Sequence, residues 1–208
     1  AVGAYAAGML TVLAGWAILP ALAVSSLLGA VVACAVSFPA LRVKGLMLVI
    51  ATLAFGEAVR LFFFNFDYQV AKGGVKLGPV GGEGFRQIRY FPEHGWTTME
   101  VMLFIWSFVA LTMALLWWFD RSRYGAVLRA VGEDELAAQS VGVNLTAMKV
   151  SAMTVGGAIA GLGGGIYAHY TTHIEHASFG ILLATFALAY PILGGLGSVF
   201  GTVVAVVF

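Results

Sequence analysis

The sequence predicts an all-α protein, a polytopic bundle of transmembrane helices. Of its 208 residues, 61% are hydrophobic and only 10% are charged, whereas about one quarter of the residues of soluble domains are charged. The apolar residues also gather in runs of roughly 20, the length that crosses a bilayer core about 30 Å thick at about 1.5 Å per helical residue. These two observations place the chain in a membrane.

Four apolar runs meet or approach the spanning length, with Pro20 and the basic corner at Arg42 and Lys44 as breaks between them. The four expected spans are 1–19, 21–41, 46–66 and 99–119. A fifth run, 150–170, is built on glycine and alanine, and two shorter apolar pieces follow it at 180–193 and 199–208. Because both ends of the sequence read as helix interior, we expect one transmembrane domain, 1–208, that is truncated at both ends.

The basic residues predict the orientation of these spans, since Lys and Arg in short loops stay on the cytoplasmic side. Two spans separate the corner at residues 42–44 from the polar segment 120–149, so both fall on one side, with Arg42, Lys44, Arg121, Arg123, Arg129 and Lys149. We therefore expect 120–149 to be a cytoplasmic loop and 67–98 a periplasmic loop. The latter is rich in glycine, and connections longer than about 15 residues are usually functional or disordered.

Several other functions are excluded by what the sequence lacks. The net charge is only +1 and the basic residues are scattered, so there is no footprint for nucleic acid. The single cysteine, Cys34, cannot form an internal disulfide or a CxxC metal site. No GxxxxGK[ST] stretch is present, so we expect no nucleotide site and no cofactor.

The segment 120–149 holds the longest helix-prone polar run of the chain. Its acidic triplet, Glu133, Asp134 and Glu135, precedes an apolar-leaning stretch, and acidic residues favour the positive end of a helix. Gly142 supplies the stop. The pattern predicts a helix of about two turns, too short to be stable alone. It docks either on its own bundle or into a groove of a partner protein.

Two ionisable residues interrupt the third apolar run. Glu57 and Arg60 are three positions apart, so on a helix they share a face and can pair. Ionisable residues within a span are costly unless paired or hydrated, and they often mark functional sites. The pair either has a structural role or lines a translocation pathway, which Thr52 and Gly56 on neighbouring turns would extend.

Glycine recurs at every fourth position of the fifth run, at Gly157, Gly161 and Gly165. This spacing leaves a stripe without side chains, where another helix can approach closely. We expect the stripe to serve helix packing.

A cluster of histidines follows that run, and it allows two interpretations. His169 and His173 are four positions apart, with Glu175 and His176 close behind, a donor set that zinc accepts. A membrane-embedded metal-dependent hydrolase is therefore an alternative function. However, the HExxH order of metalloproteases is absent. We favour a hydrated outer loop without a metal.

Four stretches together resemble a known transporter family. The residues AAQSVG, 137–142, are similar to the AAxxxG core of the loop by which ABC importer permeases contact their ATPase subunits. The surrounding run SRYGAVLRAVGEDELAAQSVGVN resembles the branched-chain amino acid ABC transporter permease family. So do LRVKGLMLVIATLAFGEAVRL at 41–61, GGGIYAHY at 163–170 and LGGLGSVFGTV at 193–203.

The resemblance implies a transport subunit of the ABC importer permease type in the bacterial inner membrane, and not an enzyme. It implies branched-chain amino acids or a related small polar solute as cargo. Its expected partners are ABC ATPase subunits, a homologous second permease subunit, a periplasmic solute-binding protein and the lipid bilayer. The expected ATPase-coupling residues are Glu133, Asp134, Glu135, Leu136, Ala137, Ala138 and Gly142. A passive solute channel is a further alternative, which would transport without nucleotide.

Overall fold

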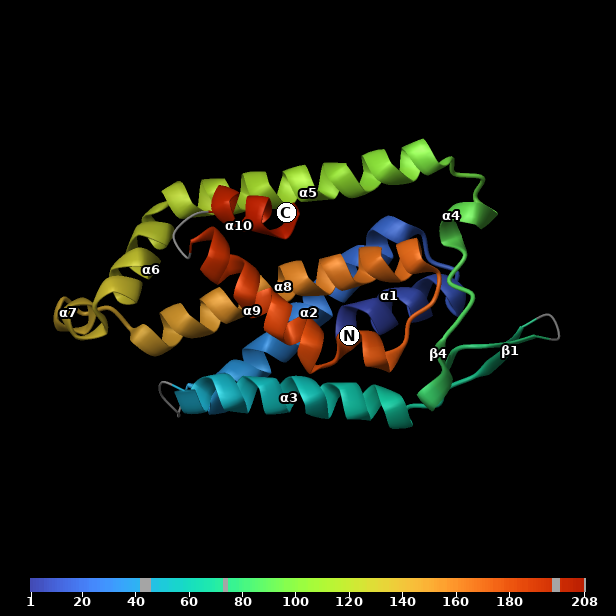
Figure 1. Ribbon diagram of the computed structural model, residues 1–208, viewed down its shortest axis with the longest axis horizontal. Coiled ribbons are helices and arrows are strands. Elements are labelled where there is room, and N and C mark those ends of the chain that lie inside the picture. The colour runs from blue at the N-terminus through green and yellow to red at the C-terminus, as the bar shows by residue number, and fades with distance from the viewer. Residues whose placement is uncertain (42–45, 73–74, 196–198, 208) are drawn as a thin grey trace.

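A computed structural model describes residues 1–41, 46–72, 75–195 and 199–207, so Arg42 and Lys44 lie outside the described residues. The described chain is an elongated bundle of helices that carries small strands at one end (Figure 1). Its longest helices are α2 (Ile18–Ala40), α3 (Leu46–Asn65), α5 (Thr98–Arg121) and α8 (Leu145–Thr171). The shorter helices are α1 (Val2–Val12), α4 (Tyr90–Glu93), α6 (Arg123–Glu133), α7 (Glu135–Ser140), α9 (Ile181–Gly194) and α10 (Val199–Val207).

Length and hydropathy qualify five described segments to cross a membrane. They are Ile18–Ala40, Met47–Asn65, Thr98–Arg121, Leu145–Thr171 and His176–Gly194, the last of which joins the 3₁₀ turn at His176–Phe179 to α9. The prediction of an all-α, polytopic transmembrane bundle is confirmed.

The predicted boundaries near the N-terminus are wrong. Helix α1 ends at Val12, and its eleven residues measure only roughly 16 Å at the usual rise. The chain turns at Gly15, whose φ of +70° is a left-handed conformation that favours glycine. Pro20 is not a break but lies in the first turn of α2. Proline is accepted there because the first amide groups of a helix have no intrahelical acceptor.

Helices α2 and α8 form the centre of the bundle, and glycine sets their separation. A Cβ atom on Gly161 would lie 2.4 Å from the carbonyl oxygen of Ser25, and one on Gly29 would lie 2.3 Å from that of Gly157. Helix α1 joins the same contact, since a Cβ on Gly3 would lie 2.1 Å from the Gly161 oxygen. The three backbones therefore meet at distances that exclude larger residues.

The connection between α3 and α5 is more ordered than a plain loop. It contains two small antiparallel sheets, β1 (Val70–Lys72) with β2 (Val75–Leu77), and β3 (Pro79–Val80) with β4 (Gly84–Phe85), around a 3₁₀ turn at Gly81–Glu83. Phe85 exchanges backbone hydrogen bonds of 2.7 and 2.8 Å with Ile174, beyond the end of α8, and both side chains are fully buried. A Cβ on Gly84 would lie 2.2 Å from the Ile174 oxygen. This pairing holds the connection against the bundle.

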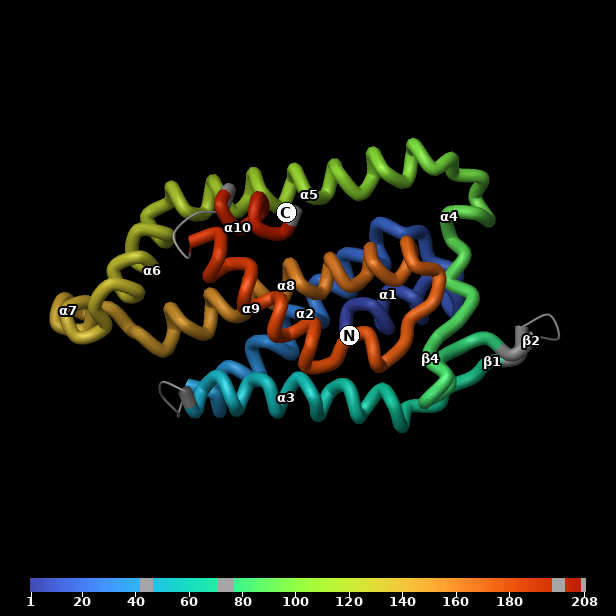
Figure 2. Tube along the Cα trace, viewed as in Figure 1, coloured from blue at the N-terminus to red at the C-terminus, as the bar shows by residue number. Residues whose placement is uncertain are grey.

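The polar segments lie at opposite ends of the bundle. Helix α7, with the end of α6 and the start of α8, occupies one end, beside which α3 begins (Figure 1). The strands and α4 occupy the other, as the path of the chain in Figure 2 also shows. We call these the α7 end and the loop end. The basic residues Arg121, Arg123, Arg129 and Lys149 therefore lie opposite the strands.

Candidate functional site

Helix α6 is fixed to the two long helices beside it. The hydroxyl oxygen of Ser122 caps it by accepting from the Gly125 amide at 3.2 Å. The Arg129 guanidinium pairs with the Asp120 carboxylate and donates to the Asp120 carbonyl oxygen at 2.7 Å, at the end of α5. Tyr124 hydrogen-bonds to the Ser151 hydroxyl of α8. These contacts join α6 to both α5 and α8.

Helix α7 has six residues, close to the two turns that the sequence predicts ahead of Gly142. Glu133 ends α6, and Asp134 stands between the two helices with an extended backbone (φ −149°, ψ 107°). Its carboxylate accepts from the amides of Leu136 at 2.8 Å and Ala137 at 3.0 Å, a cap that requires a nonhelical residue. Gly142 follows the six residues of α7 with a φ of +88°.

Helix α7 is exposed along its whole length except at Ala138. Leu136 and Val141 are each 79% exposed, whereas Ala138 is only 5% exposed. Exposed aliphatic residues on a short polar segment are available for binding a partner. We call Leu136, Val141 and the exposed acids Glu133 and Glu135 the α7 surface.

An ion pair connects the α7 surface to α8. The Lys149 ammonium nitrogen lies 2.6 Å from Oε1 of Glu135. Both residues line a cleft of about 700 Å³ whose other walls include Leu41 and Leu48, from the ends of α2 and α3. The α7 end thus joins a short exposed helix to the three helices behind it.

Three polar residues of α3, Thr52, Glu57 and Arg60, are partly buried. Arg60 donates from Nε to the Glu57 carboxylate at 2.7 Å, and the two side chains are 23% and 28% exposed. The Thr52 hydroxyl donates to the Val49 carbonyl at 2.9 Å. A Cβ on Gly56 would meet no described atom within 4 Å. Arg60 is covered in part by the chain near Gly180, since a Cβ on Gly180 would lie 4.0 Å from its Cδ atom.

The histidines occupy separate environments. His169 is fully buried, its Nδ1 lying 2.7 Å from the Gly165 oxygen and its Nε2 3.1 Å from the Thr11 hydroxyl oxygen. His173 instead lies 2.9 Å from the Glu175 carboxylate near the surface, and this hydrogen bond lowers the pKa of Glu175 below its ordinary value of 4.5. Among the described residues, no three His, Cys, Asp or Glu side chains come close enough to hold a metal ion.

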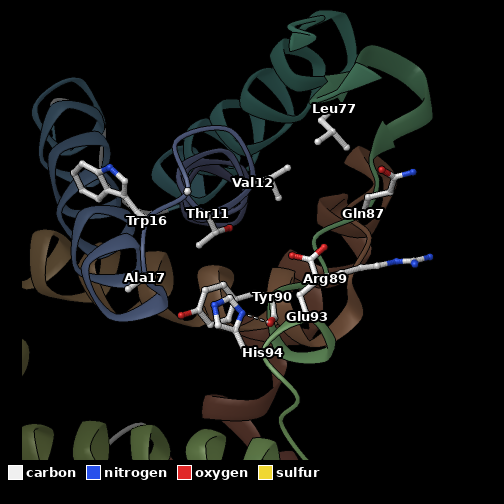
Figure 3. Close-up of a pocket in the computed structure, with 11 residues that line it drawn as sticks. Thr11, Val12, Trp16, Ala17, Leu77, Gln87, Arg89, Tyr90, Glu93 and His94 are labelled. Atoms are coloured by element: carbon white, nitrogen blue, oxygen red, sulfur yellow. Dashed lines mark hydrogen bonds between the residues drawn. The ribbon is translucent and has the colours of Figure 1, made fainter. Parts of the chain in front are cut away.

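A second cleft, at the loop end, is formed by residues that sequence reasoning missed. It has a volume of about 700 Å³ between the end of α1, the α1–α2 turn and residues 87–94 (Figure 3). Arg89 and Glu93, and likewise Tyr90 and His94, are four residues apart in RYFPEH. Since residues four apart share a helical face, this spacing was the sequence signal that could have indicated the cleft.

A bundle with five apolar segments of spanning length and an exposed polar helix at one end defines a multi-pass membrane protein of the permease class. The family model for the branched-chain amino acid transport system permease component matches residues 1–208, and the chain belongs to this family.

Similar proteins include the high-affinity branched-chain amino acid transport system permease proteins LivM of Salmonella typhimurium and Escherichia coli, which are 31% and 29% identical. Each match covers 100% of this chain and 53% of the relative, so the chain spans about half their length. The nucleoside ABC transporter permease protein NupC of Lactococcus lactis is 38% identical over 64 residues, 30% of this chain and 20% of its own. No solved structure matches significantly.

Proposed function

We propose that this chain is the membrane-spanning part of an ATP-driven importer in the bacterial inner membrane, with branched-chain amino acids or a related small polar solute as cargo. The relatives matched over the whole chain are named for branched-chain amino acid transport, whereas the nucleoside permease matches over 30% of it. The proposal rests on one observation. The α7 surface is exposed, and the Glu135–Lys149 ion pair joins it to the central helix α8.

The α7 surface receives the motion of an ATPase partner. Leu136 and Val141 enter an apolar groove of that partner, as short helices do in protein complexes, while Ala138 stays against the bundle. Displacement of α7 passes to α8 through Lys149 and through Tyr124 of α6. Because glycines bring α1, α2 and α8 to backbone contact, the three helices move as one body. This motion alternates access to the solute between the two sides of the membrane.

The pathway itself lies against α3. A carboxylate and a guanidinium beyond the middle of an apolar span require water or protein around them. The described residues cover Glu57 and Arg60 only in part and leave the face of α3 at Gly56 open. A homologous second permease subunit covers it, so that Thr52, Gly56, Glu57 and Arg60 border the solute path between the two subunits. The periplasmic solute-binding protein delivers to the connection 67–98 at the loop end.

Crosslinking from α7 tests the proposal. In a Cys34→Ser background, Leu136→Cys and Val141→Cys place single thiols on the α7 surface of the assembled transporter. We expect both to crosslink to the ATPase subunit, and Gln87→Cys at the loop end to give no such product. An ATPase subunit that is captured from Gln87→Cys, or not captured from α7, would falsify the arrangement.

Transport in reconstituted vesicles tests the energy source. We expect leucine uptake to require ATP, and Ala138→Asp to abolish uptake while leaving membrane insertion intact, because a carboxylate cannot replace a methyl group that is only 5% exposed. Uptake that is equal with and without ATP would identify a passive channel instead.

A further inference from the structure

The loop-end cleft is lined by a basic and an acidic side chain, those of Arg89 and Glu93. Arg89 and Glu93 are one helical turn apart, with the Glu93 amide 3.0 Å from the Arg89 carbonyl oxygen. Both are exposed, and neither pairs with an oppositely charged side chain among the described residues. In Figure 3 the Glu93 carboxylate points towards α1, while the Arg89 guanidinium extends to the rim. A ligand with both charges can therefore meet each of them.

Aromatic and aliphatic side chains line the cleft beside Arg89 and Glu93. The rings of Tyr90 and His94 stack with centroids 4.1 Å apart, and His94 is held by a 2.8 Å hydrogen bond between Nδ1 and the Tyr90 oxygen. Val12 and Leu77 line the opposite part of the cleft. Ligand sites of similar size combine such apolar walls with a few fixed polar groups.

The floor of the cleft is connected to the core. Thr11 lines it and is only 8% exposed. Its hydroxyl lies 3.1 Å from Nε2 of His169, the buried histidine of α8. A ligand that settles on Thr11 would therefore rest directly on the contact between α1 and α8.

We propose that the loop-end cleft is a receiving site for an α-amino acid zwitterion. Glu93 binds the ammonium group, Arg89 closes from the rim on the carboxylate, and Val12, Leu77 and the Tyr90–His94 stack surround a short apolar side chain. Both charges of an amino acid are on the same carbon, which suits two side chains one helical turn apart. This assignment rests on the proposed import function and gives its solute a location, since a nucleoside lacks both charges.

Photolabelling tests the site in the assembled transporter. The probe is photo-leucine, a diazirine analogue that keeps both charged groups, and labelled peptides are identified by mass spectrometry. We expect label within residues 11–17 or 87–94, protected by excess leucine but not by isopentylamine or 4-methylpentanoate, each of which lacks one charge. Label confined to other segments, or protection by either single-charge compound equal to that by leucine, overturns the proposal.

Substitutions provide the matched comparison. We expect Glu93→Gln and Arg89→Gln each to reduce labelling about tenfold, the loss expected for one charged hydrogen bond. Glu83→Gln and Arg86→Gln, exposed in the same connection but outside the cleft lining, should label normally. Unchanged labelling of both cleft variants would overturn the site. The ATPase crosslink from α7, measured on the same samples, reports separately whether the importer assignment stands.

Discussion

Glu135 of α7 and Lys149 of α8 face each other across the cleft at the α7 end, with 2.6 Å between the carboxylate and ammonium groups. Their side chains are 51% and 36% exposed. A pair this exposed contributes little to stability. It does, however, join the exposed helix to α8, which packs closely against α1 and α2 through glycine.

We expect Lys149→Ala to change the free energy of unfolding by less than about 1 kcal/mol but to lower solute-stimulated ATPase activity about fivefold, near the low end of coupling free energies between sites. The charge exchange Glu135→Lys with Lys149→Glu should restore part of the activity, and Arg86→Ala at the loop end serves as control. If the exchange is no better than Lys149→Ala alone, the pair does not transmit motion.

Gly161→Ala should destabilise the bundle by about 1–3 kcal/mol, the usual cost of overpacking, because the added methyl group would lie 2.4 Å from the Ser25 oxygen. Gly163→Ala is the matched control on the same helix, since its Cβ would meet nothing within 4 Å. It should be neutral or stabilising by up to about 1 kcal/mol. Unfolding in detergent measures both variants, and equal stabilities would contradict the close packing.

Asp134→Ala should loosen α7 by about 1 kcal/mol through the loss of its N-terminal cap. The amides of Leu136 and Ala137 lose their acceptor, so their hydrogen exchange should accelerate. Asp67→Ala at the loop end should leave these amides unchanged. Protection that persists in Asp134→Ala would show that docking, not the cap, holds α7.

Thr11→Val keeps the shape of the side chain but removes the hydroxyl partner of the buried His169. An unpaired buried polar group costs about 1–3 kcal/mol, and thermal unfolding should detect the loss. Thr185→Val is the control, because that residue is exposed and bonds only within α9. If Thr11→Val melts at the wild-type temperature, the contact between Thr11 and His169 does not stabilise the bundle.

Acidification should weaken the chain segment after α8. The hydrogen bond from His173, aided by its charge, lowers the pKa of Glu175, so the ionised carboxylate stabilises the folded state. This contribution is complete above the ordinary value of 4.5 and is lost as the pH falls through the lower folded value. After correction for the intrinsic pH dependence of amide exchange, exchange at residues 173–176 should therefore be faster in acid in the wild type. Glu175→Gln should show the faster exchange already at pH 6, with Glu83→Gln as control.

The long helices were predictable because apolar length alone identifies a membrane span. The boundaries were not. Pro20 was treated as a break by a rule that fails in the first helical turn, and α8 starts before the predicted 150 because Asn144 caps it by accepting from the Ala147 amide at 3.0 Å. The family resemblance is confirmed.

The sequence predicted contacts within the candidate sites only between residues that are close together in the chain. Glu57 and Arg60 are bonded as their spacing suggested, although their role in the pathway stays a prediction. The loop-end cleft is formed where the end of α1 and the α1–α2 turn meet residues 87–94, and no local pattern indicates that these distant segments meet. The coupling function of α7 likewise stays a prediction, since its partner is a different chain.

Helix α5 has no buried residue. Its start is held by Thr97 and Glu100 in a reciprocal cap, and its first half supplies Val101, Phe104 and Phe108 to the aromatic cluster around Phe91. The second half of α5 leads into α6, and its residues Leu111, Leu115 and Trp118 are each at least 51% exposed. The second half of α5 can therefore tilt with little repacking of its own side chains. Any such tilt is passed on through α6, whose Tyr124 is bonded to Ser151 of α8.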